Sequence, residues 1–297
     1  VMGRNNVDDL MIRVLVKQGK ILWDQSCPVP TRYGICMKIV YVEKKSKTDK
    51  WMVATVRFEK RDRGKVKAAV EKFDQALKVY NRWKGTQTIL GAIDGNDKAQ
   101  RIYEALDAVA LAKFDLAEAS DEVGISMELP ELSLKNQKEQ EKSMKAIANW
   151  VETQTKMIAK NKQLYEEAAK LELGKKKSSW YIPAAGRFGA IYKNFVTKMK
   201  NMKFGPEIEN NIELKLTIQD IFAQQYEKME ELATQGFESC VKEARKNGRY
   251  DEWFEFCENE LAELRRSVSP VSDEVWGAPE QMDLKLSRST VAPVPVR

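Results

Sequence analysis

The chain has 297 residues, of which 50 are lysine or arginine and 44 are aspartate or glutamate, so its formal net charge is +6. It contains no histidine, the usual general base and zinc ligand near neutral pH, which excludes Ser-His-Asp catalysis, Cys-His catalysis and histidine-bearing zinc sites. The length fits one large domain or two smaller ones, and 43% apolar residues are enough to form a hydrophobic core.

The first local pattern along the chain predicts a β-hairpin. Apolar residues alternate with other residues on both sides of a charged connector at residues 44–50, and a period of two is typical of paired strands with one apolar face. The alternating positions are Ile35, Met37, Ile39 and Tyr41, then Met52, Ala54, Val56 and Phe58. Residues 11–16 are a candidate third strand, and Pro28 and Pro30 predict an extended loop between them.

Beyond the hairpin, apolar residues recur at intervals of three and four, which predicts a series of long helices. The expected helices cover residues 65–85, 96–120 and 133–173, a long region from residue 206 with a break at Gly236, and residues 251–265. In the third helix Met144, Val151, Ile158 and Tyr165 are each seven apart and predict a narrow apolar seam. The companion positions Ile147, Gln154, Asn161 and Ala168 are only half apolar.

These patterns predict a mainly α fold: an elongated body of long helices, a small N-terminal β-hairpin of two or three strands, and an extended C-terminal tail. We divide the chain into an N-terminal extension with the hairpin (1–62), a helical domain (63–266) and the tail (267–297). Four of the nine prolines lie in that tail, which favours an irregular segment. Within it Trp276 is a candidate anchor, either on a partner or on the chain's own domain.

Charge is distributed unevenly along the sequence. Residues 174–206 contain eight basic residues and no acidic one, whereas residues 207–265 contain fifteen acidic and seven basic residues. The basic residues of the first segment are Lys175, Lys176, Lys177, Arg187, Lys193, Lys198, Lys200 and Lys203. The aromatic residues interleaved with them are Trp180, Tyr181, Phe188, Tyr192, Phe195 and Phe204. Together with Trp180, the basic residues are the candidate partner-binding residues. This composition fits a single-stranded RNA groove, but also a buried aromatic stripe beside a solvated lysine face. A second basic run, residues 44–67, has ten basic and three acidic residues.

The four cysteines, Cys27, Cys36, Cys240 and Cys257, include no Cys-x-x-Cys pair, which argues against a structural zinc site. They are too sparse for a disulfide-stapled secreted scaffold, so we expect reduced thiols. The alternative is covalent attachment of a prosthetic group, such as a chromophore, at one or more of them. Cys257, within an aromatic stretch, is the most suggestive position. No cofactor is otherwise required.

Three functional hypotheses follow. The first is a non-catalytic basic linker that holds together acidic subunits of a large complex; by analogy of class alone, phycobilisome linker proteins of the algal light-harvesting antenna work in this way. The second is an RNA-binding ribonucleoprotein component that uses residues 174–206. The third, a carboxylate or lysine enzyme, has no site signature in the sequence. We therefore expect a protein that is not an enzyme.

The sequence also bears on location. No stretch approaches the roughly 20 consecutive apolar residues of a membrane helix, so we expect no membrane span. Because the sequence begins at Val1, we expect either a trimmed chain or a mature form from which a targeting peptide was removed. The second case predicts the interior of an organelle, a plastid before a mitochondrion, with the cytoplasm as the alternative.

Overall fold

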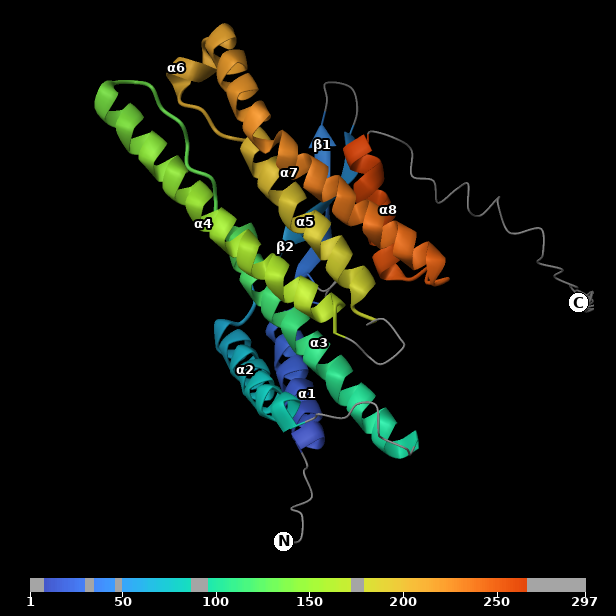
Figure 1. Cartoon of the computed structure of the whole chain (residues 1–297). Helices are drawn as coiled ribbons and strands as arrows, with labels where there is room; N and C mark the ends of the chain where they lie inside the picture. Colours follow the sequence, from blue (N-terminus) through green and yellow to red (C-terminus); the bar gives the residue numbers. More distant parts are fainter. Residues whose placement is uncertain (1–7, 30–34, 46–49, 87–95, 172–178, 266–297) are drawn as a thin grey trace, which may run out of the picture.

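The computed structural model describes residues 8–29, 35–45, 50–86, 96–171 and 179–265 (Figure 1). The described chain is mainly helical, with two strands near its N-terminal end, which confirms the predicted fold class. The predicted tail, with Trp276, lies outside the described residues. In chain order the elements are α1 (Asp8–Ser26), β1 (Met37–Lys45), β2 (Lys50–Phe58), α2 (Arg63–Thr86), α3 (Asn96–Ser126), α4 (Gln137–Ala169), α5 (Tyr181–Lys200), α6 (Pro206–Glu209), α7 (Ile212–Lys246) and α8 (Glu252–Arg265).

The predicted hairpin is confirmed as a two-stranded antiparallel sheet. Met37 lies opposite Phe58, Tyr41 lies opposite Ala54, and Lys45 lies opposite Lys50 at the turn end. The two alternating sets found in the sequence therefore face each other across the ladder, as cross-strand neighbours on one face must.

The predicted third strand is wrong, because residues 11–16 lie inside helix α1. The buried residues of this helix are Asp9, Ile12, Val16, Gly19, Trp23 and Ser26, spaced by three and four residues. The apolar residues of residues 11–16 are therefore compatible with both strand and helix periodicity. Packing against α2 and α3 selects the helix. Asp8 and Asp9 occupy the first turn, where negative charge is favourable to the helix dipole.

A first hydrophobic core joins α1, α2 and the first half of α3. Trp23, Phe73 and Val109 are among its most deeply buried members, and Ala69 and Ala76 let the helices approach closely. A Cβ added to Gly19 would lie only 2.5 Å from the Phe73 ring, so glycine is required where α1 crosses α2. Residues on both sides of the predicted boundary at residue 62 share this core.

A second core contains the second half of α3 with α4, α5, α7 and α8. Its centre is aromatic: the Phe114 ring lies 5.3 Å from Tyr165 and 5.8 Å from Trp253, both edge to face. Because α3 runs without interruption through both cores, it connects the two ends of the elongated helical body (Figure 1).

The expected seam of α4 is only partly right. Ile158 and Tyr165 are buried, but Met144 is 49% exposed and Val151 is partly exposed. The companion row is the buried one, and it includes Gln154 and Asn161. Gln154 is accommodated because its Nε2 donates to the backbone oxygen of Gly124, 3.0 Å away, and a buried polar group with a partner costs little.

The expected break at Gly236 is also wrong, since α7 continues from Ile212 to Lys246. A Cβ on Gly236 would lie 2.6 Å from the backbone nitrogen of Gly189 in α5. The absent side chain thus permits close contact between the two helix backbones. Tertiary packing therefore explains this glycine. The close contact between α5 and α7 offsets the modest cost of placing a glycine inside a helix.

Candidate partner-binding hairpin

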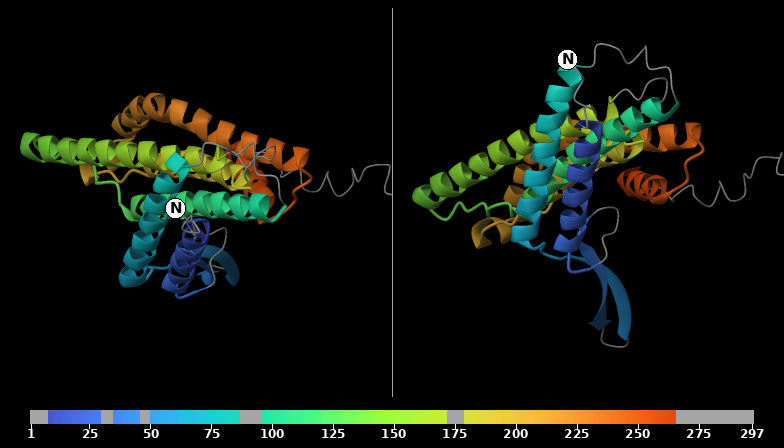
Figure 2. Two further views of the ribbon diagram at one scale, coloured as in Figure 1. Left: turned by 60° about the horizontal axis from the view of Figure 1, so that its bottom comes forward. Right: turned by 90° about the horizontal axis from the view of Figure 1, so that it is seen from below.

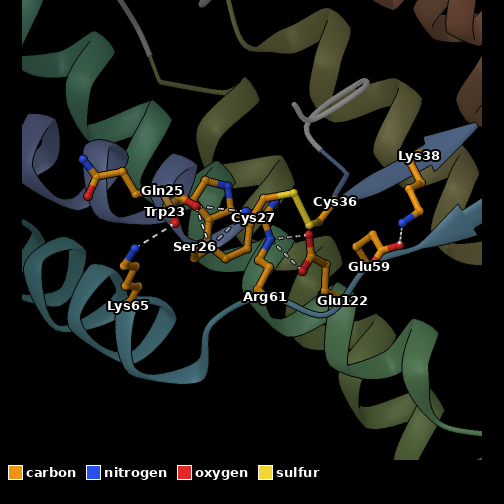
Figure 3. Close-up of a disulfide and its surroundings, with 10 residues drawn as sticks. All are labelled: Trp23, Gln25, Ser26, Cys27, Cys36, Lys38, Glu59, Arg61, Lys65 and Glu122. Carbon is orange, nitrogen blue, oxygen red and sulfur yellow. Dashed lines mark hydrogen bonds and ion pairs between the residues drawn. A yellow bond between two sulfur atoms is a disulfide. The ribbon is translucent and has the colours of Figure 1, made fainter. Parts of the chain in front are cut away.

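The hairpin projects away from the helical layers (Figure 2, right). An isolated two-stranded sheet is marginally stable in water, so its position depends on how its base is attached. Three features hold that base: two connect the hairpin to α1 and α3, and the third joins its two sides to each other. They are drawn in Figure 3.

The first feature is a disulfide bond between Cys27, just after α1, and Cys36, just before β1, with their Cα atoms 5.6 Å apart. Both cysteines are largely buried. The backbone continues the attachment on the other strand: the Glu59 amide donates to the Cys36 oxygen and the Asp62 amide donates to the Ser26 oxygen, each at 2.8 Å. Both ends of the hairpin are therefore tied to the end of α1.

The second feature is the Arg61 side chain, which is only 3% exposed. Its Nε lies 2.7 and 2.8 Å from the two carboxylate oxygens of Glu122 on α3. Its Nη1 donates to the backbone oxygen of Trp23 and to Ser26 Oγ, and the guanidinium stacks 3.8 Å from the centre of the Trp23 ring. Burial raises the pKa of Glu122, and the hydrogen bond from Arg61 opposes that rise.

The third feature is the ion pair between Lys38 and Glu59, 2.6 Å apart, which crosses the base of the hairpin. Lys38 included, the two strands carry five basic residues, Lys38, Lys44, Lys45, Lys50 and Arg57, and one acidic residue, Glu43. The Arg57 side chain is 69% exposed, and Tyr41 is also 69% exposed. The hairpin is thus a positively charged projection held at its base.

The basic segment at residues 174–206 has a different arrangement. Lys175, Lys176 and Lys177 lie outside the described residues. Arg187 is 1% exposed, and its Nε and Nη2 each lie 2.7 Å from an oxygen of Glu118 on α3. Glu118 also accepts a hydrogen bond from the Tyr165 hydroxyl at 2.6 Å. Arg187 is therefore a core residue.

The remaining candidates of this segment are also involved in contacts within the chain. Lys193 pairs with Glu260 and Glu263, Lys200 pairs with Glu230, and Lys198 donates to the backbone oxygens of Gly124, Ile125 and Met127 at the end of α3. Trp180 is half-buried, 5.1 Å from the Phe114 ring. Of the described candidates only Lys203 is exposed with no side-chain partner in the described chain. The interpretation of the rings as core is correct, and the partner-binding assignment of these residues is not supported.

The expectation of reduced cysteines is wrong, because the structure pairs all four. The second disulfide joins Cys240 on α7 to Cys257 on α8, both fully buried, with their Cα atoms 6.2 Å apart. Attachment of a chromophore to any of the four sulfurs would first require its disulfide to be broken. The spacings of nine and seventeen residues carried no signal of this pairing, because only the fold brings the cysteines together.

A line of acidic residues along α3 was not among the predicted site residues: Asp115, Glu118, Asp121 and Glu122. Burial raises the pKa of Asp115 to about 7, and burial with the neighbouring Glu118 raises the pKa of Asp121 to about 7. Asp115 is 3% exposed, and its Oδ2 has no hydrogen-bond partner in the described chain. A sequence signal existed: these acids recur at three- and four-residue intervals on a helix otherwise rich in alanine and leucine.

Within the described ranges, no group of three or more cysteine, aspartate or glutamate side chains is placed to hold a metal ion. No helix in the same ranges is both long and apolar enough to cross a membrane. Comparisons of the chain with protein-family models, with curated proteins and with solved structures found no match. The candidate site therefore stands on its own geometry and charge.

Proposed function

We propose that the protein is a non-catalytic assembly protein that binds an acidic polypeptide partner through the basic hairpin. The observation that carries this proposal is the charge of the β1 and β2 sequences, five basic residues against one acidic, with Arg57 69% exposed, on an element clamped by Arg61 and the Cys27–Cys36 disulfide. A rigid attachment keeps the charged strands in a fixed position, which reduces the entropy lost when a partner binds.

The geometry of the hairpin favours a polypeptide as the partner. The outer edges of β1 and β2 pair with no other strand in the described chain, so they present backbone donors and acceptors to which an extended segment can add. The net positive charge of the two strands attracts carboxylates on such a segment and speeds its association. An acidic strand satisfies both features at once.

The proposal is tested with three probes of equal length: a peptide of alternating glutamate and valine, the same peptide with lysine for glutamate, and single-stranded oligouridine RNA. Binding of the full chain is followed by fluorescence anisotropy at low and high salt. The test variant is K44E/K45E/R57E. The control variant, K142E/K145E/K160E, makes the same change in net charge at exposed lysines of α4.

We expect the acidic peptide to bind the native chain, with an affinity that falls as salt rises. The hairpin variant should lose about tenfold or more in affinity, and the control variant should bind like the native chain. Equal losses in both variants would show that net charge alone matters. Tighter binding of oligouridine at the hairpin would favour the ribonucleoprotein alternative instead.

The finer hypotheses remain predictions: the phycobilisome analogy, the plastid location and a covalently attached chromophore. One absorption spectrum of the complex isolated from its native source tests them together. Strong visible bands would support pigmented partners, and excess absorption in the nucleic-acid band would support RNA. Two disulfides are typical of chains that fold in an oxidising compartment, which argues against the cytoplasmic alternative.

A further inference from the structure

A second surface, separate from the hairpin, lies between α1 and α3. It is a groove of about 570 Å³ whose lining is mostly apolar. Large apolar side chains of α1 remain strongly exposed along it: Leu10 is 49%, Val14 is 42% and Ile21 is 48% exposed. Tyr103 and Leu111 of α3 form the facing wall. A continuous apolar surface of this kind on a soluble chain is typical of an interaction site.

The spacing of the α1 residues indicates what shape of partner fits. Leu10, Val14, Lys17 and Ile21 follow one another at intervals of four, three and four residues. This is the spacing of the core positions of a coiled coil, where the side chains of one helix insert between those of another. The groove is therefore shaped for a helix that packs along α1.

The charges in the groove indicate what the partner helix carries. Arg13 is paired with Glu104 at 2.7 Å, and Lys20 is paired with Asp24 at 2.6 Å. Asp107, on the α3 wall, accepts a hydrogen bond from Ser179 Oγ at 2.9 Å. Lys17 is exposed and has no ion-pair partner among the described residues. It occupies a core position between Val14 and Ile21. A single lysine at such a position selects a partner and its register, because only a carboxylate opposite it compensates the charge.

We propose that the α1–α3 groove binds an amphipathic helix of a partner protein, with an apolar stripe interrupted by one glutamate or aspartate opposite Lys17. A partner helix is favoured over a second copy of this chain because Asp24, the carboxylate that continues the α1 seam after Ile21, is already paired with Lys20. This surface is independent of the hairpin, so either proposal can fail without the other.

The test uses two helical peptide probes with leucine at the core positions. One has glutamate at a central core position, and the other has lysine there. Binding to the full chain is measured by fluorescence anisotropy. We expect the native chain to bind the glutamate peptide about tenfold more tightly than the lysine peptide, and Lys17→Glu to reverse that preference.

Val14→Asp should abolish binding of both peptides, because it places a charge inside the seam. Leu216→Asp is the matched control: Leu216 is 55% exposed on α7, far along the chain from the groove, and its variant should bind like the native chain. Because Val14 is also exposed, we expect the Val14→Asp variant to have the same melting temperature as the native chain. The hairpin variant K44E/K45E/R57E should bind the glutamate peptide normally.

Three results would overturn the proposal. Equal affinity of both peptides for the native chain and for Lys17→Glu would exclude selection by Lys17. Concentration-dependent dimerisation that Val14→Asp abolishes would show that a second copy occupies the groove. Tighter binding of the glutamate peptide after removal of residues 266–297 would show that the groove holds the chain's own C-terminal segment.

Discussion

The two basic regions of this protein have similar compositions and opposite surroundings. In α5 and the residues next to it, Arg187, Lys193, Lys198 and Lys200 each bind a carboxylate or backbone oxygens of a neighbouring helix. In the hairpin, the strands project from the body, and Arg57 is largely exposed. Basic charge in the sequence therefore has two settings here: in the helix it connects elements within the chain, and in the hairpin it lies on strands that project from the body.

The difference arises from what lies beside each region. Helix α5 packs against α3, α4, α7 and α8, and its cations reach carboxylates such as Glu118, Glu230 and Glu260 on these neighbours. Among the described residues, the hairpin is attached to the body at its base, through Arg61 and the Cys27–Cys36 disulfide. A count of basic residues cannot distinguish these cases, because it contains no information on which acidic segments are adjacent in space.

The largest expected effect is at Arg187. Arg187→Met should lower the free energy of unfolding by about 3–5 kcal/mol, because it leaves the Glu118 carboxylate buried without its cation. Urea unfolding followed by circular dichroism measures the change. The control is Lys203→Ala at an exposed position, for which we expect a change below about 0.5 kcal/mol. Comparable changes in the two variants would contradict the contrast between buried and exposed charge.

A second variant separates charge from packing at the same place. Glu118→Gln combined with Arg187→Met should be less destabilising than Arg187→Met alone, because no uncompensated carboxylate remains and the glutamine can still accept from Tyr165. If the double variant is the less stable of the two, then the loss at Arg187 comes from packing against Trp253 and Phe256 rather than from charge.

The next largest effects concern the two disulfides. From loop closure alone, C27A/C36A and C240A/C257A should each cost about 3 kcal/mol of stability. Their functional effects should differ: loss of Cys27–Cys36 releases the hairpin base and weakens binding of the acidic peptide, whereas loss of Cys240–Cys257 leaves that binding unchanged. Hydrogen exchange of the β1 and β2 amides measures the release of the hairpin, and fluorescence anisotropy measures binding of the acidic peptide. Equal loss of binding in the two variants would show that the hairpin is not positioned locally.

A further expected effect is a pH dependence from Asp115. In the folded chain this carboxyl keeps its proton to about pH 7, whereas in the unfolded chain it loses it near pH 4. The folded state therefore binds more protons between these values, and stability should fall as pH rises through that window. The charged groups that act on it are Lys20, Glu118, Asp24 and Arg61.

Asp115→Asn should remove part of this slope, so that the variant gains stability relative to the native chain at pH 8 but not at pH 4. Urea unfolding at several pH values measures it. Asp121, whose pKa is also about 7, should retain its own contribution. A native chain whose stability rises steadily from pH 5 to pH 8 would rule out a protonated Asp115.

Much of the secondary structure could be predicted from the sequence. The hairpin pairing and the approximate ranges of α2, α3, α4, α7 and α8 followed from the period of apolar residues. Helices α1 and α5 were not among the predicted ranges. The predicted ranges differ from the observed ones by a few residues at most ends, because capping groups such as Asn136 and Asn211 set where a helix begins. The candidate site was predicted only in part: the basic run 44–67 was recognised, but its attachment was not.

The sequence by itself determined the fold class, the absence of histidine chemistry and the position of the hairpin, because these depend on composition and short-range spacing. Only the tertiary structure decided that residues 11–16 are helical, that Gly236 lies at a helix contact, that the cysteines pair, and that Arg187 is buried while Arg57 is exposed. Each of these depends on residues distant in sequence: Phe73 beside Gly19, Gly189 beside Gly236, Glu118 beside Arg187. Local patterns specify which elements form, and long-range packing decides which side chains remain available to a partner.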